Sequence, residues 1–361
     1  MKFLIAAGGT GGHITPGVAI ANKLKELGHE VKFLGTNTGM EVDLVPKAGY
    51  ELKIISAKGL HRGFSLKNIK TIKCLFDGLK DVKRIIDEEK PNMIIGTGGY
   101  VTAPAIIAAI QKKIPNMIHE SNALPGKTTT WLSKKVDCVA VGFEAARERL
   151  KNGKNVVYTG NPTKMQGAFN YEETRKKLNI TKPLVLVFGG SQGAKKINET
   201  MISLINETEI KDYQIIYATG PKNYDDIISR IKVQNENVKI EKYIYNMEEV
   251  MSAADIAVCR SGALTITELG IIGVPSILVP LPTAAENHQY YNAKTIEDTG
   301  AGIIIEEKDL EKESLEKVIK EMINNKEKLK EMKQKAIKKE NVGAIDKIME
   351  EINKLIKFDI N

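Results

Sequence analysis

The sequence predicts an α/β protein made of two parallel, doubly wound sheets, and three observations support this fold class. Short apolar segments alternate with helical patterns along the 361 residues, as in parallel sheets whose strands are joined by helices. One apolar segment runs into a glycine-rich loop at residues 8–12, and the same order returns 181 residues later at residues 189–193. A chain of this length has room for two domains. We therefore expect two Rossmann-like domains, each opened by a glycine loop.

The predicted strands are short apolar runs that end at glycine or polar residues. In the first half they are expected at residues 3–6, 30–34, 52–55, 92–95, 116–119, 138–141 and 156–158. In the second half they are expected at residues 184–188, 214–218, 238–241, 256–259, 276–279 and 302–304. All the glycine loops, including a third at residues 96–99, follow strands. Since ligands of open α/β sheets bind at the carboxyl ends of strands, two domains that face each other would bring these loops to one cleft.

The C-terminal part of the chain is predicted to be helical. Residues 310–357 are rich in Lys and Glu at helical spacing, which is typical of a solvated helical surface. The last helix begins at Ala344 and carries one apolar stripe, formed by Ile345, Ile348, Met349, Ile352 and Leu355. We expect domains at residues 1–163 and 164–340, with a C-terminal helix in 341–361 that packs back on the first domain.

Composition and charge narrow the possible functions. The chain begins with a strand pattern rather than a signal peptide, and no run reaches the ~20 apolar residues of a spanning helix. Its three cysteines lack metal-ligand spacing and fit a reducing cytoplasm. Residues 1–160 hold 24 Lys and Arg against 14 Asp and Glu, a net of +10, while the remainder holds 29 against 31, a net of −2. With no nucleic-acid motif and only 6% aromatic residues, this basic half favours an anionic membrane or substrate over nucleic acid.

The first glycine loop has the features of a phosphate-binding site. A strand, a glycine loop and a helix follow one another, so bare backbone N–H groups and the positive helix end would face an anion. Glycine permits the tight turn and the close approach of a ligand. His13 stands inside this loop, where neither a Walker loop nor a dinucleotide fingerprint requires a histidine. The plain alternative is an ordinary turn between a strand and a helix.

Two further segments in the second half carry polar groups after a predicted strand. At residues 258–268 a strand ends in a Ser-Gly turn before a helix, and Glu268 follows about one turn later, where its carboxylate can accept bonds from ribose hydroxyls. The alternative is a carboxylate that merely favours the helix N-terminus. At residues 279–293 two prolines precede several amide side chains and an imidazole. These groups could hydrogen-bond to sugar hydroxyls. The alternative is that they cap the N-terminus of a helix.

Taken in order, these motifs resemble the MurG family, whose members add N-acetylglucosamine to lipid I in peptidoglycan synthesis. The resemblance covers residue 1 to about residue 301 and includes the segments at residues 8–13, 98–100, 119–122, 160–162, 189–194, 260–265, Glu268 and Gln289. It implies a GT-B fold, in which two Rossmann-like domains face a cleft. It also implies an inverting transferase that moves N-acetylglucosamine from UDP-N-acetylglucosamine to the C4 hydroxyl of the muramoyl sugar of lipid I, giving lipid II.

The resemblance also assigns roles to individual residues. In the second domain the residues expected to hold the donor are Ser191 at the diphosphate, the backbone of Ile244 at the uracil, Ala263, Leu264 and Thr265 at the diphosphate and nucleoside, Glu268 at the ribose and Gln289 at the sugar. In the first domain Thr10, Gly11, Gly12 and Asn122 are expected to reach the donor across the cleft. Two positions depart from the family. Lys164 replaces the usual arginine and keeps the charge without the bidentate geometry, and Ser121 replaces the usual glutamine.

The chemistry of glycosyl transfer indicates which residue is the base. The acceptor hydroxyl must lose a proton, and a neutral imidazole suits this role. His13 is the candidate, and His119 is a reserve candidate with a structural or acceptor-binding alternative. Helix N-termini and Lys164 can stabilise the leaving diphosphate without a metal, so we expect no metal ligands and no required cofactor, with stimulation by a divalent cation left open. The expected partners are UDP-N-acetylglucosamine, lipid I, the anionic membrane surface and proteins of cell-wall synthesis, and no nucleic acid.

The same residues also bear on other functions. A related GT-B transferase acting on diacylglycerol would share the donor motifs, whereas a UDP-N-acetylglucosamine 2-epimerase should show more acid–base carboxylates in them. A nicotinamide-dependent oxidoreductase needs an acidic residue after the second strand, where this chain has Gly35. A sugar-nucleotide sensor without catalysis would leave His13 and the basic first half unexplained.

Since lipid I is anchored in a bilayer and no spanning helix is predicted, we expect a peripheral protein on the cytoplasmic face of the cell membrane. Residues 64–86 are the best candidate for the membrane contact. Their apolar stripe is Ile69, Ile72, Leu75, Phe76, Leu79, Val82 and Ile86, surrounded by Lys67, Lys70, Lys73, Lys80, Lys83 and Arg84. Because this helix must also pack on the sheet, Ile72 or Val82 should be core, and Leu75, Phe76 and Leu79 more exposed.

Overall fold

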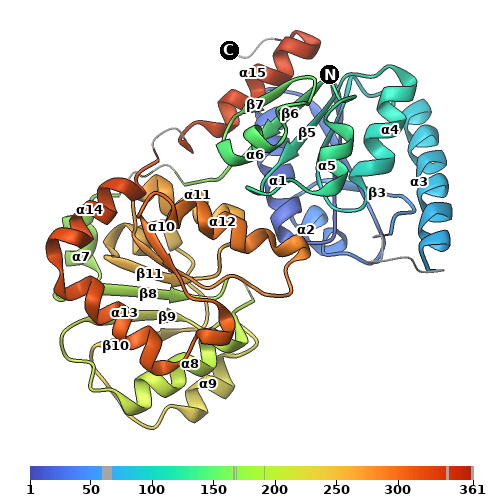
Figure 1. The fold of residues 1–361 in the computed structure, drawn as a ribbon. Coiled ribbons are helices and arrows are strands. Elements are labelled where there is room, and N and C mark those ends of the chain that lie inside the picture. The colour runs from blue at the N-terminus through green and yellow to red at the C-terminus, as the bar shows by residue number, and fades with distance from the viewer. Residues whose placement is uncertain (59–66, 166, 168, 191, 339–340, 359–361) are drawn as a thin grey trace. The chain divides into compact units, whose positions relative to one another are not determined.

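The chain forms two compact units, each built around its own parallel sheet (Figure 1). The computed structural model describes residues 1–58, 67–165, 167, 169–190, 192–338 and 341–358. The first unit comprises Met1–Lys164 and Gly343–Asn361, and the second comprises Met165–Val342.

The sheet of the first unit has the strand order β3-β2-β1-β4-β5-β6-β7, and every described pairing is parallel. Its strands are β1 (Lys2–Ala7), β2 (Glu30–Gly35), β3 (Glu51–Ile54), β4 (Met93–Gly98), β5 (Asn116–Glu120), β6 (Cys138–Val141) and β7 (Val156–Tyr158). Its helices are α1 (Gly11–Glu26), α2 (Glu41–Lys47), α3 (Lys67–Glu89), α4 (Thr102–Lys112), α5 (Lys127–Leu132), α6 (Glu144–Arg149) and α15 (Ala344–Ile356). The strand order reverses between β1 and β4, which is the point where ligands bind in such folds.

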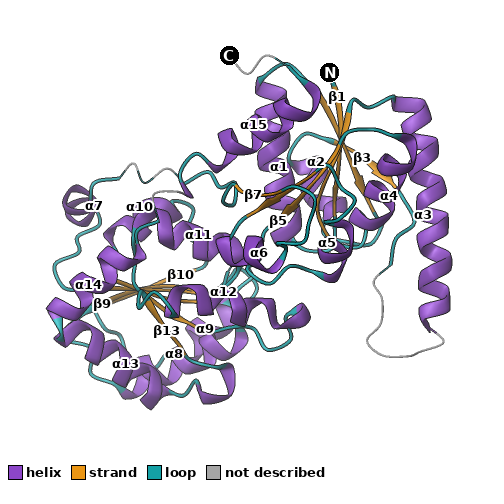
Figure 2. Ribbon diagram, turned by 45° about the horizontal axis from the view of Figure 1, so that its top comes forward, coloured by secondary structure: helices purple, strands orange, loops and turns teal. Residues whose placement is uncertain are grey.

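Helices cover both faces of this sheet (Figure 2). Alternate residues of β1 point to opposite faces: Phe3 and Ile5 pack with α1, α2 and α15, and Leu4 packs with the helices from α3 to α6. The apolar stripe of α15 is buried at Ile348 and Ile352 in the former cluster. The last helix of the chain therefore completes one face of the first sheet.

Helix α3 is held to the first unit by its second half. Val82 is fully buried, as predicted for a core position, and Phe76 is 61% exposed. Leu75 and Leu79 are half-buried, so both are more exposed than Val82, as predicted, and Leu79 packs against the core on the side where α3 contacts α4. The side chain of Ile72 lies outside the described residues, as do residues 59–66.

The second unit repeats the arrangement with the strand order β10-β9-β8-β11-β12-β13. Its strands are β8 (Leu184–Phe188), β9 (Gln214–Ala218), β10 (Val238–Glu241), β11 (Ile256–Cys259), β12 (Ser276–Leu278) and β13 (Gly302–Ile304). Its helices are α7 (Tyr171–Lys177), α8 (Lys195–Glu207), α9 (Tyr224–Arg230), α10 (Met247–Ala253), α11 (Ala263–Ile272), α12 (His288–Glu297), α13 (Lys312–Asn324) and α14 (Lys326–Ala336), with short 3-10 turns η1 (Ala285–Asn287) and η2 (Glu307–Asp309). The reversal of strand order lies between β8 and β11.

The predicted fold class and every predicted strand are confirmed, with one informative difference in β4. That strand was expected to end at Ile95, but it continues through Gly96 and Thr97 to Gly98. A β-carbon at Gly96 would fall 2.6 Å from Cγ2 of Thr102, so α4 packs closely on the end of the strand. Part of the third glycine loop is therefore strand. Within the described residues, no helix has both the length and the apolar character needed to span a bilayer.

Candidate active site

The glycine loop of the first unit joins β1 to α1 at the point where the strand order reverses. Thr10 precedes the helix in extended conformation, and its carbonyl accepts the first helical hydrogen bonds from His13 and Ile14. The backbone N–H groups of Gly11 and Gly12 belong to the first turn of this 16-residue helix. Such a terminus favours an anion, so the structure brings Thr10, Gly11 and Gly12 together as a candidate phosphate or hydroxyl contact.

His13 lies in the first turn of α1 with its imidazole oriented by the loop itself. Its Nδ1 is 3.1 Å from the carbonyl oxygen of Gly8 and 3.5 Å from Oγ1 of Thr10. A carbonyl oxygen can only accept, so Nδ1 carries the proton in this contact and Nε2 keeps its lone pair. The ring is half-buried. This arrangement suits a general base that takes a proton at Nε2.

The glycines after β4 allow the loop and the histidine to pack together. A β-carbon at Gly98, where φ is +122°, would fall 2.4 Å from Cδ2 of His13. A β-carbon at Gly99 would fall 2.2 Å from the carbonyl oxygen of Gly8. Thr97 also donates a hydrogen bond from its hydroxyl to the backbone carbonyl of His13 at 2.8 Å. These glycines therefore seat the loop that carries His13.

His119, the reserve candidate, is placed very differently. It is 1% exposed in β5, its Nε2 is 3.3 Å from the carbonyl of Gly160, and its Nδ1 is 3.4 Å from the hydroxyl of Ser121. Burial lowers the pKa of His119 to about 4, although the bond to Gly160 opposes the shift. Both ring nitrogens thus have protein partners inside the core, and the structural alternative fits this residue.

Asn122 stands in the loop after β5, which the carboxylate of Glu120 holds in place. Glu120 accepts hydrogen bonds from the backbone N–H groups of Asn122 and Gly126, both at 3.1 Å, and from the hydroxyl of Thr129 at 2.7 Å. Asn122 is half-buried. Its position after a strand of the first sheet is compatible with a role in substrate binding.

In the second unit the Ser-Gly turn leads from β11 into α11, whose first turn contains Ala263, Leu264 and Thr265. Gly262 precedes the helix in extended conformation. The hydroxyl of Ser261 is buried and has no hydrogen-bond partner among the described residues. An orphaned hydroxyl beside a helix N-terminus is consistent with an anionic ligand here.

Side chains from neighbouring elements form hydrogen bonds and an ion pair around the Ser-Gly turn. Asn292, fully buried in α12, donates a bond to the carbonyl of Ser261 at 3.2 Å. Arg260 donates bonds to the carbonyls of Val279 and Pro280 and forms an ion pair with Glu307. Arg260 therefore ties together the ends of β11 and β12.

Glu268 and Gln289 lie on the two helices that follow these strands. Glu268 is half-buried in the middle of α11. Gln289 accepts a bond from the backbone N–H of Leu281 through Oε1 at 3.0 Å, so its orientation leaves the Nε2 amide group as the donor. Just before it, Glu286 and Asn287 both have left-handed backbone, at φ +52° and +57°. Such strain often accompanies functional segments.

The remaining predicted residues are more dispersed. Ile244 is buried between the exposed side chains of Tyr243 and Tyr245 in the loop after β10. Lys164 is exposed at the end of the first unit. Ser191 lies outside the described residues. No group of three His, Cys, Asp or Glu side chains suited to a metal ion occurs in the part of the chain that the structure describes.

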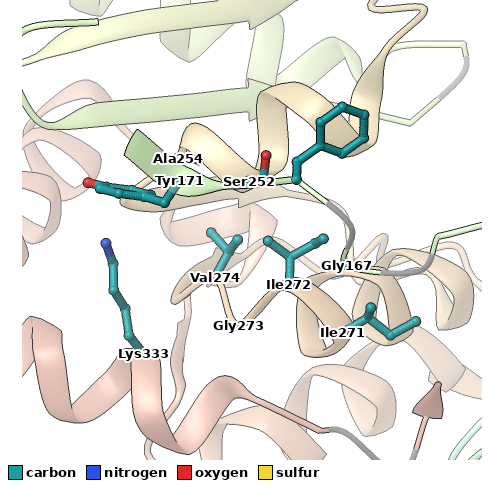
Figure 3. Close-up of a pocket in the computed structure, with 10 residues that line it drawn as sticks. Gly167, Tyr171, Ser252, Ala254, Ile271, Ile272, Gly273, Val274 and Lys333 are labelled. Atoms are coloured by element: carbon teal, nitrogen blue, oxygen red, sulfur yellow. The ribbon is translucent and has the colours of Figure 1, made fainter. Parts of the chain in front are cut away.

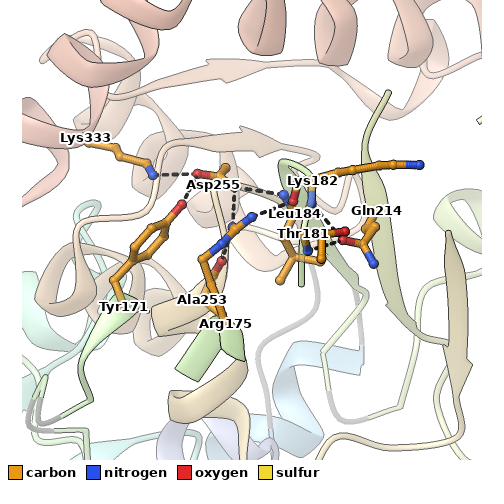
Figure 4. A network of polar contacts seen from close by, with 9 residues as sticks. All are labelled: Tyr171, Arg175, Thr181, Lys182, Leu184, Gln214, Ala253, Asp255 and Lys333. Carbon is orange, nitrogen blue, oxygen red and sulfur yellow. Dashed lines mark hydrogen bonds and ion pairs between the residues drawn. The ribbon is translucent and has the colours of Figure 1, made fainter. Parts of the chain in front are cut away.

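A small pocket of about 160 Å³ in the second unit has a different character (Figure 3). It is lined by Gly167, Phe169, Tyr171, Ser252, Ala254, Ile271, Ile272, Gly273, Val274 and Lys333. Beside it, Asp255 directly precedes β11, at the amino ends of the strands (Figure 4). Ligands of these sheets bind at the opposite, carboxyl ends.

The contacts of Asp255 explain this pocket as structural. Its carboxylate accepts bonds from the Tyr171 hydroxyl and the Leu184 N–H, both at 2.8 Å, and pairs with Arg175 and Lys333 at 2.8 and 2.7 Å (Figure 4). Burial alone would raise the pKa of Asp255, but Lys333 and the hydrogen bonds hold it below its ordinary value. The network fastens α7 and α14 to the sheet.

One residue of the first site is absent from the sequence-based prediction. Glu41, in the first turn of α2, is fully buried and accepts a hydrogen bond from Gly9 in the glycine loop at 2.8 Å. No local pattern in the sequence indicates this contact, because it depends on how α2 packs against α1, β2 and β3. The burial of Glu41 and its contact with the glycine loop become visible only in the folded structure.

Comparison with known proteins places the whole chain in one family. Residues 3–141 match the glycosyltransferase family 28 N-terminal domain, and residues 184–348 match the C-terminal domain of that family. A curated relative from Acetivibrio thermocellus, named UDP-N-acetylglucosamine–N-acetylmuramyl-(pentapeptide) pyrophosphoryl-undecaprenol N-acetylglucosamine transferase, is 43% identical over 99% of both chains. The crystal structure of Acinetobacter baumannii MurG matches with a TM-score of 0.79 at 28% identity, covering 98% of this chain and 99% of the other.

A more distant structure separates fold from function. A UDP-N-acetylglucosamine 2-epimerase from Listeria monocytogenes matches with a TM-score of 0.64 at 15% identity over 98% of this chain and 96% of the other, so it shares the fold alone. The family is instead shown by the full-length relative and by the matches to both family-28 domains. The chain therefore belongs to the MurG family within glycosyltransferase family 28, and it is a glycosyltransferase with the GT-B fold.

Proposed function

We propose that this protein transfers N-acetylglucosamine from UDP-N-acetylglucosamine to the C4 hydroxyl of the muramoyl sugar of lipid I, forming lipid II. The observation that carries the proposal is the imidazole of His13, whose Nδ1–H faces the Gly8 carbonyl while Nε2 keeps its lone pair. The proposal is supported by the 43% identity to a relative named for this reaction. His119, the other predicted base, is less suited to meet an acceptor hydroxyl, because its side chain is buried.

In the proposed reaction His13 Nε2 takes the proton of the acceptor hydroxyl. The hydroxyl oxygen forms a bond to C1 of the sugar, while the bond from C1 to the diphosphate oxygen breaks and UDP leaves with the electron pair. Attack opposite the leaving group inverts the configuration at C1. A neutral imidazole whose Nε2 keeps its lone pair is suited to such a step.

The donor is assigned mainly to the second unit. The N-terminus of α11, with Ala263, Leu264 and Thr265, would bind the diphosphate and nucleoside region. Glu268 would accept hydrogen bonds from the ribose, Gln289 would donate to the sugar through its Nε2, and the Ile244 backbone would bind the uracil. The proposed contact of Ser191 with the diphosphate concerns a residue outside the described part of the chain.

Residues of the first unit add contacts to the same donor in this proposal. They are Thr10, Gly11, Gly12 and Asn122, with Lys164 supplying positive charge to the diphosphate. Helix N-termini and a lysine can stabilise a departing diphosphate, so the proposed step requires no cofactor. Whether a divalent cation stimulates the reaction is measured by adding Mg²⁺ to the assay.

We further propose that α3 and nearby basic residues bring the first unit to the cytoplasmic face of the membrane. Phe76 is exposed on α3 between the exposed lysines Lys73 and Lys80. On α5, Trp131 is 55% exposed, in an open hollow lined also by Lys127, Thr130 and Lys134. Exposed aromatic rings among lysines favour the headgroup region of anionic lipid. The protein would then be peripheral.

The function is tested with radiolabelled UDP-N-acetylglucosamine and a lipid I analogue, with diacylglycerol as a parallel acceptor. The proposal expects label in the lipid I product and none in diacylglycerol. Label in diacylglycerol alone would assign the related lipid transferase. Conversion of UDP-N-acetylglucosamine without any acceptor would assign an epimerase, and either result overturns the proposed reaction.

A further inference from the structure

One peptide group joins Glu41 to His13. The peptide between Gly8 and Gly9 donates its N–H to Oε2 of Glu41 at 2.8 Å and accepts at its carbonyl from Nδ1 of His13 at 3.1 Å. The carboxylate of Glu41, the Gly8–Gly9 peptide and the imidazole of His13 are therefore linked by a chain of two hydrogen bonds. The two bonds are made by opposite ends of the same rigid, planar unit.

Glu41 is built into the core rather than placed there by chance. It is fully buried, and its other oxygen, Oε1, accepts from the backbone N–H of Thr36 at 2.9 Å and from its hydroxyl at 2.7 Å. Burial would raise the pKa of Glu41, but the bonds from Gly9 and Thr36 outweigh it and hold the pKa below its ordinary value. The carboxylate is thus ionised at neutral pH, and three donors meet its charge.

Close packing leaves the carboxylate little freedom. A β-carbon at Gly39 would fall 2.0 Å from Oε2 of Glu41, and one at Gly8 would fall 2.9 Å from Oε1. The glycine at residue 35 would likewise meet Cγ of Glu41 at 2.7 Å. Glycine residues from β2, the α2 turn and the loop therefore make room for one buried charge.

We propose that Glu41 is a positioning residue for His13 and acts on it through the Gly8–Gly9 peptide. The fixed carboxylate holds the peptide plane, and the plane holds the imidazole in the tautomer with Nδ1 protonated and Nε2 available. A charge-assisted bond at the N–H end also polarises the peptide, so its carbonyl becomes a stronger acceptor for Nδ1–H. This strengthens the basicity of Nε2 in the same sense as a carboxylate bonded directly to a histidine, with the peptide interposed. The inference rests on the proposed role of His13 as the base.

The main test is Glu41→Gln, which keeps the shape of the side chain. If the glutamine oxygen keeps the two bonds from Thr36, its NH₂ group faces the N–H of Gly9, and two donors oppose each other. We expect kcat to fall about 10- to 100-fold, the range for lost supporting contacts, with the KM for UDP-N-acetylglucosamine nearly unchanged. A merely structural role would lower stability without this separation of kcat from KM.

A double variant distinguishes action through His13 from a general effect. In a His13→Ala background, Glu41→Gln should cause no further loss of kcat, because the residue it positions is gone. Asp137→Asn is the matched control: Asp137 also accepts a backbone N–H, from Asn116 at 3.2 Å, in the same unit. That variant should lose some thermal stability and keep its kcat. Fully additive losses in the double variant would contradict the proposal.

A measurement on the unaltered protein can overturn the inference even if Glu41→Gln does not fold. In ¹⁵N-histidine NMR, with His13 identified among the five histidines by its absence from His13→Ala, the neutral ring should carry its proton on Nδ1. A proton on Nε2, or a folded Glu41→Gln variant with full kcat, would overturn the inference. Absence of any transfer to lipid I by the unaltered protein would instead refute the proposed function and leave the tautomer result standing.

Discussion

The imidazole of His13 lies against the backbone of Gly98, so closely that a β-carbon at residue 98 would fall 2.4 Å from Cδ2 of the ring. The two residues belong to different strand segments of the sheet, since His13 lies in the helix that follows β1 and Gly98 ends β4. The rotation of the imidazole is therefore limited on one side by backbone and on the other by its bond to the Gly8 carbonyl.

Gly98→Ala should displace the His13 ring and lower kcat about 10- to 100-fold, since an error near 1 Å in a catalytic group can cost about that much. Alanine is also strained at a φ of +122°. Gly49→Ala is the matched control, because Gly49 has a φ of +83° but no atom within 4 Å of the added carbon. Both variants should lose thermal stability, and only Gly98→Ala should lose kcat. Equal kcat values would mean that the ring tolerates displacement.

His13→Ala should lower the rate at saturating donor about a hundredfold or more, the usual contribution of a general base. Donor affinity should change much less, because the proposed role concerns the acceptor proton. The measurement is kcat with a lipid I analogue beside UDP affinity by calorimetry. Near-normal turnover would remove His13 from the chemistry.

Glu268→Ala should weaken UDP binding by about 1–3 kcal/mol, the scale for hydrogen bonds to a charged group. The residue is half-buried on α11, the helix that follows the Ser-Gly turn. Glu321→Ala on the exposed surface of α13 is the control and should bind UDP normally. Calorimetry on folded protein decides, and unchanged affinity in Glu268→Ala would exclude it from the donor site.

Replacing Lys73 and Lys80 by glutamate should abolish sedimentation with anionic vesicles while activity on a soluble acceptor survives. Each lysine near an anionic surface contributes about 1 kcal/mol, and the attraction should weaken as salt is added. The same charge change at Lys326 and Lys330, exposed on α14 of the second unit, is the control. If the α3 variant still sediments, the membrane contact lies elsewhere, and the Trp131 surface would be tested next.

Stability of the first unit should depend on pH through His119. Its pKa is about 4 in the folded chain against an ordinary 6.5, so the unfolded state binds more protons between these values and stability rises with pH there. The contribution is fully present above about pH 6.5 and is lost as the pH falls to about 4; it amounts to roughly 3 kcal/mol.

His119→Gln removes this titration, so its stability relative to the unaltered protein should improve as the pH falls from 7 to 4. Urea unfolding followed by fluorescence measures the effect, since Trp131 is the only tryptophan and lies in the same unit. A constant difference between the two proteins across this range would show that His119 is not held neutral.

Much of the fold could be predicted because it depends on patterns that are local in the chain. Apolar runs of strand length, helical spacing between them and glycine loops after Ala7 and Phe188 specify two parallel sheets, and the structure confirms them. The ordered motifs likewise indicated the family. The end of β4 was misplaced because glycine normally marks a turn, whereas Gly96 is in the strand so that Thr102 can approach.

The site divides in the same way between sequence and tertiary structure. The sequence by itself placed His13, Glu268 and Gln289 after predicted strands, because chain order alone puts such residues at the carboxyl edge of a parallel sheet. Only the tertiary structure distinguished His13 from His119, since burial and hydrogen-bond partners are properties of packing. Only packing, too, brings Glu41 to the Gly8–Gly9 peptide, 32 residues from Gly9 along the chain. Contacts between segments so far apart depend on how α2 packs against α1, β2 and β3, and no local pattern of residues encodes them.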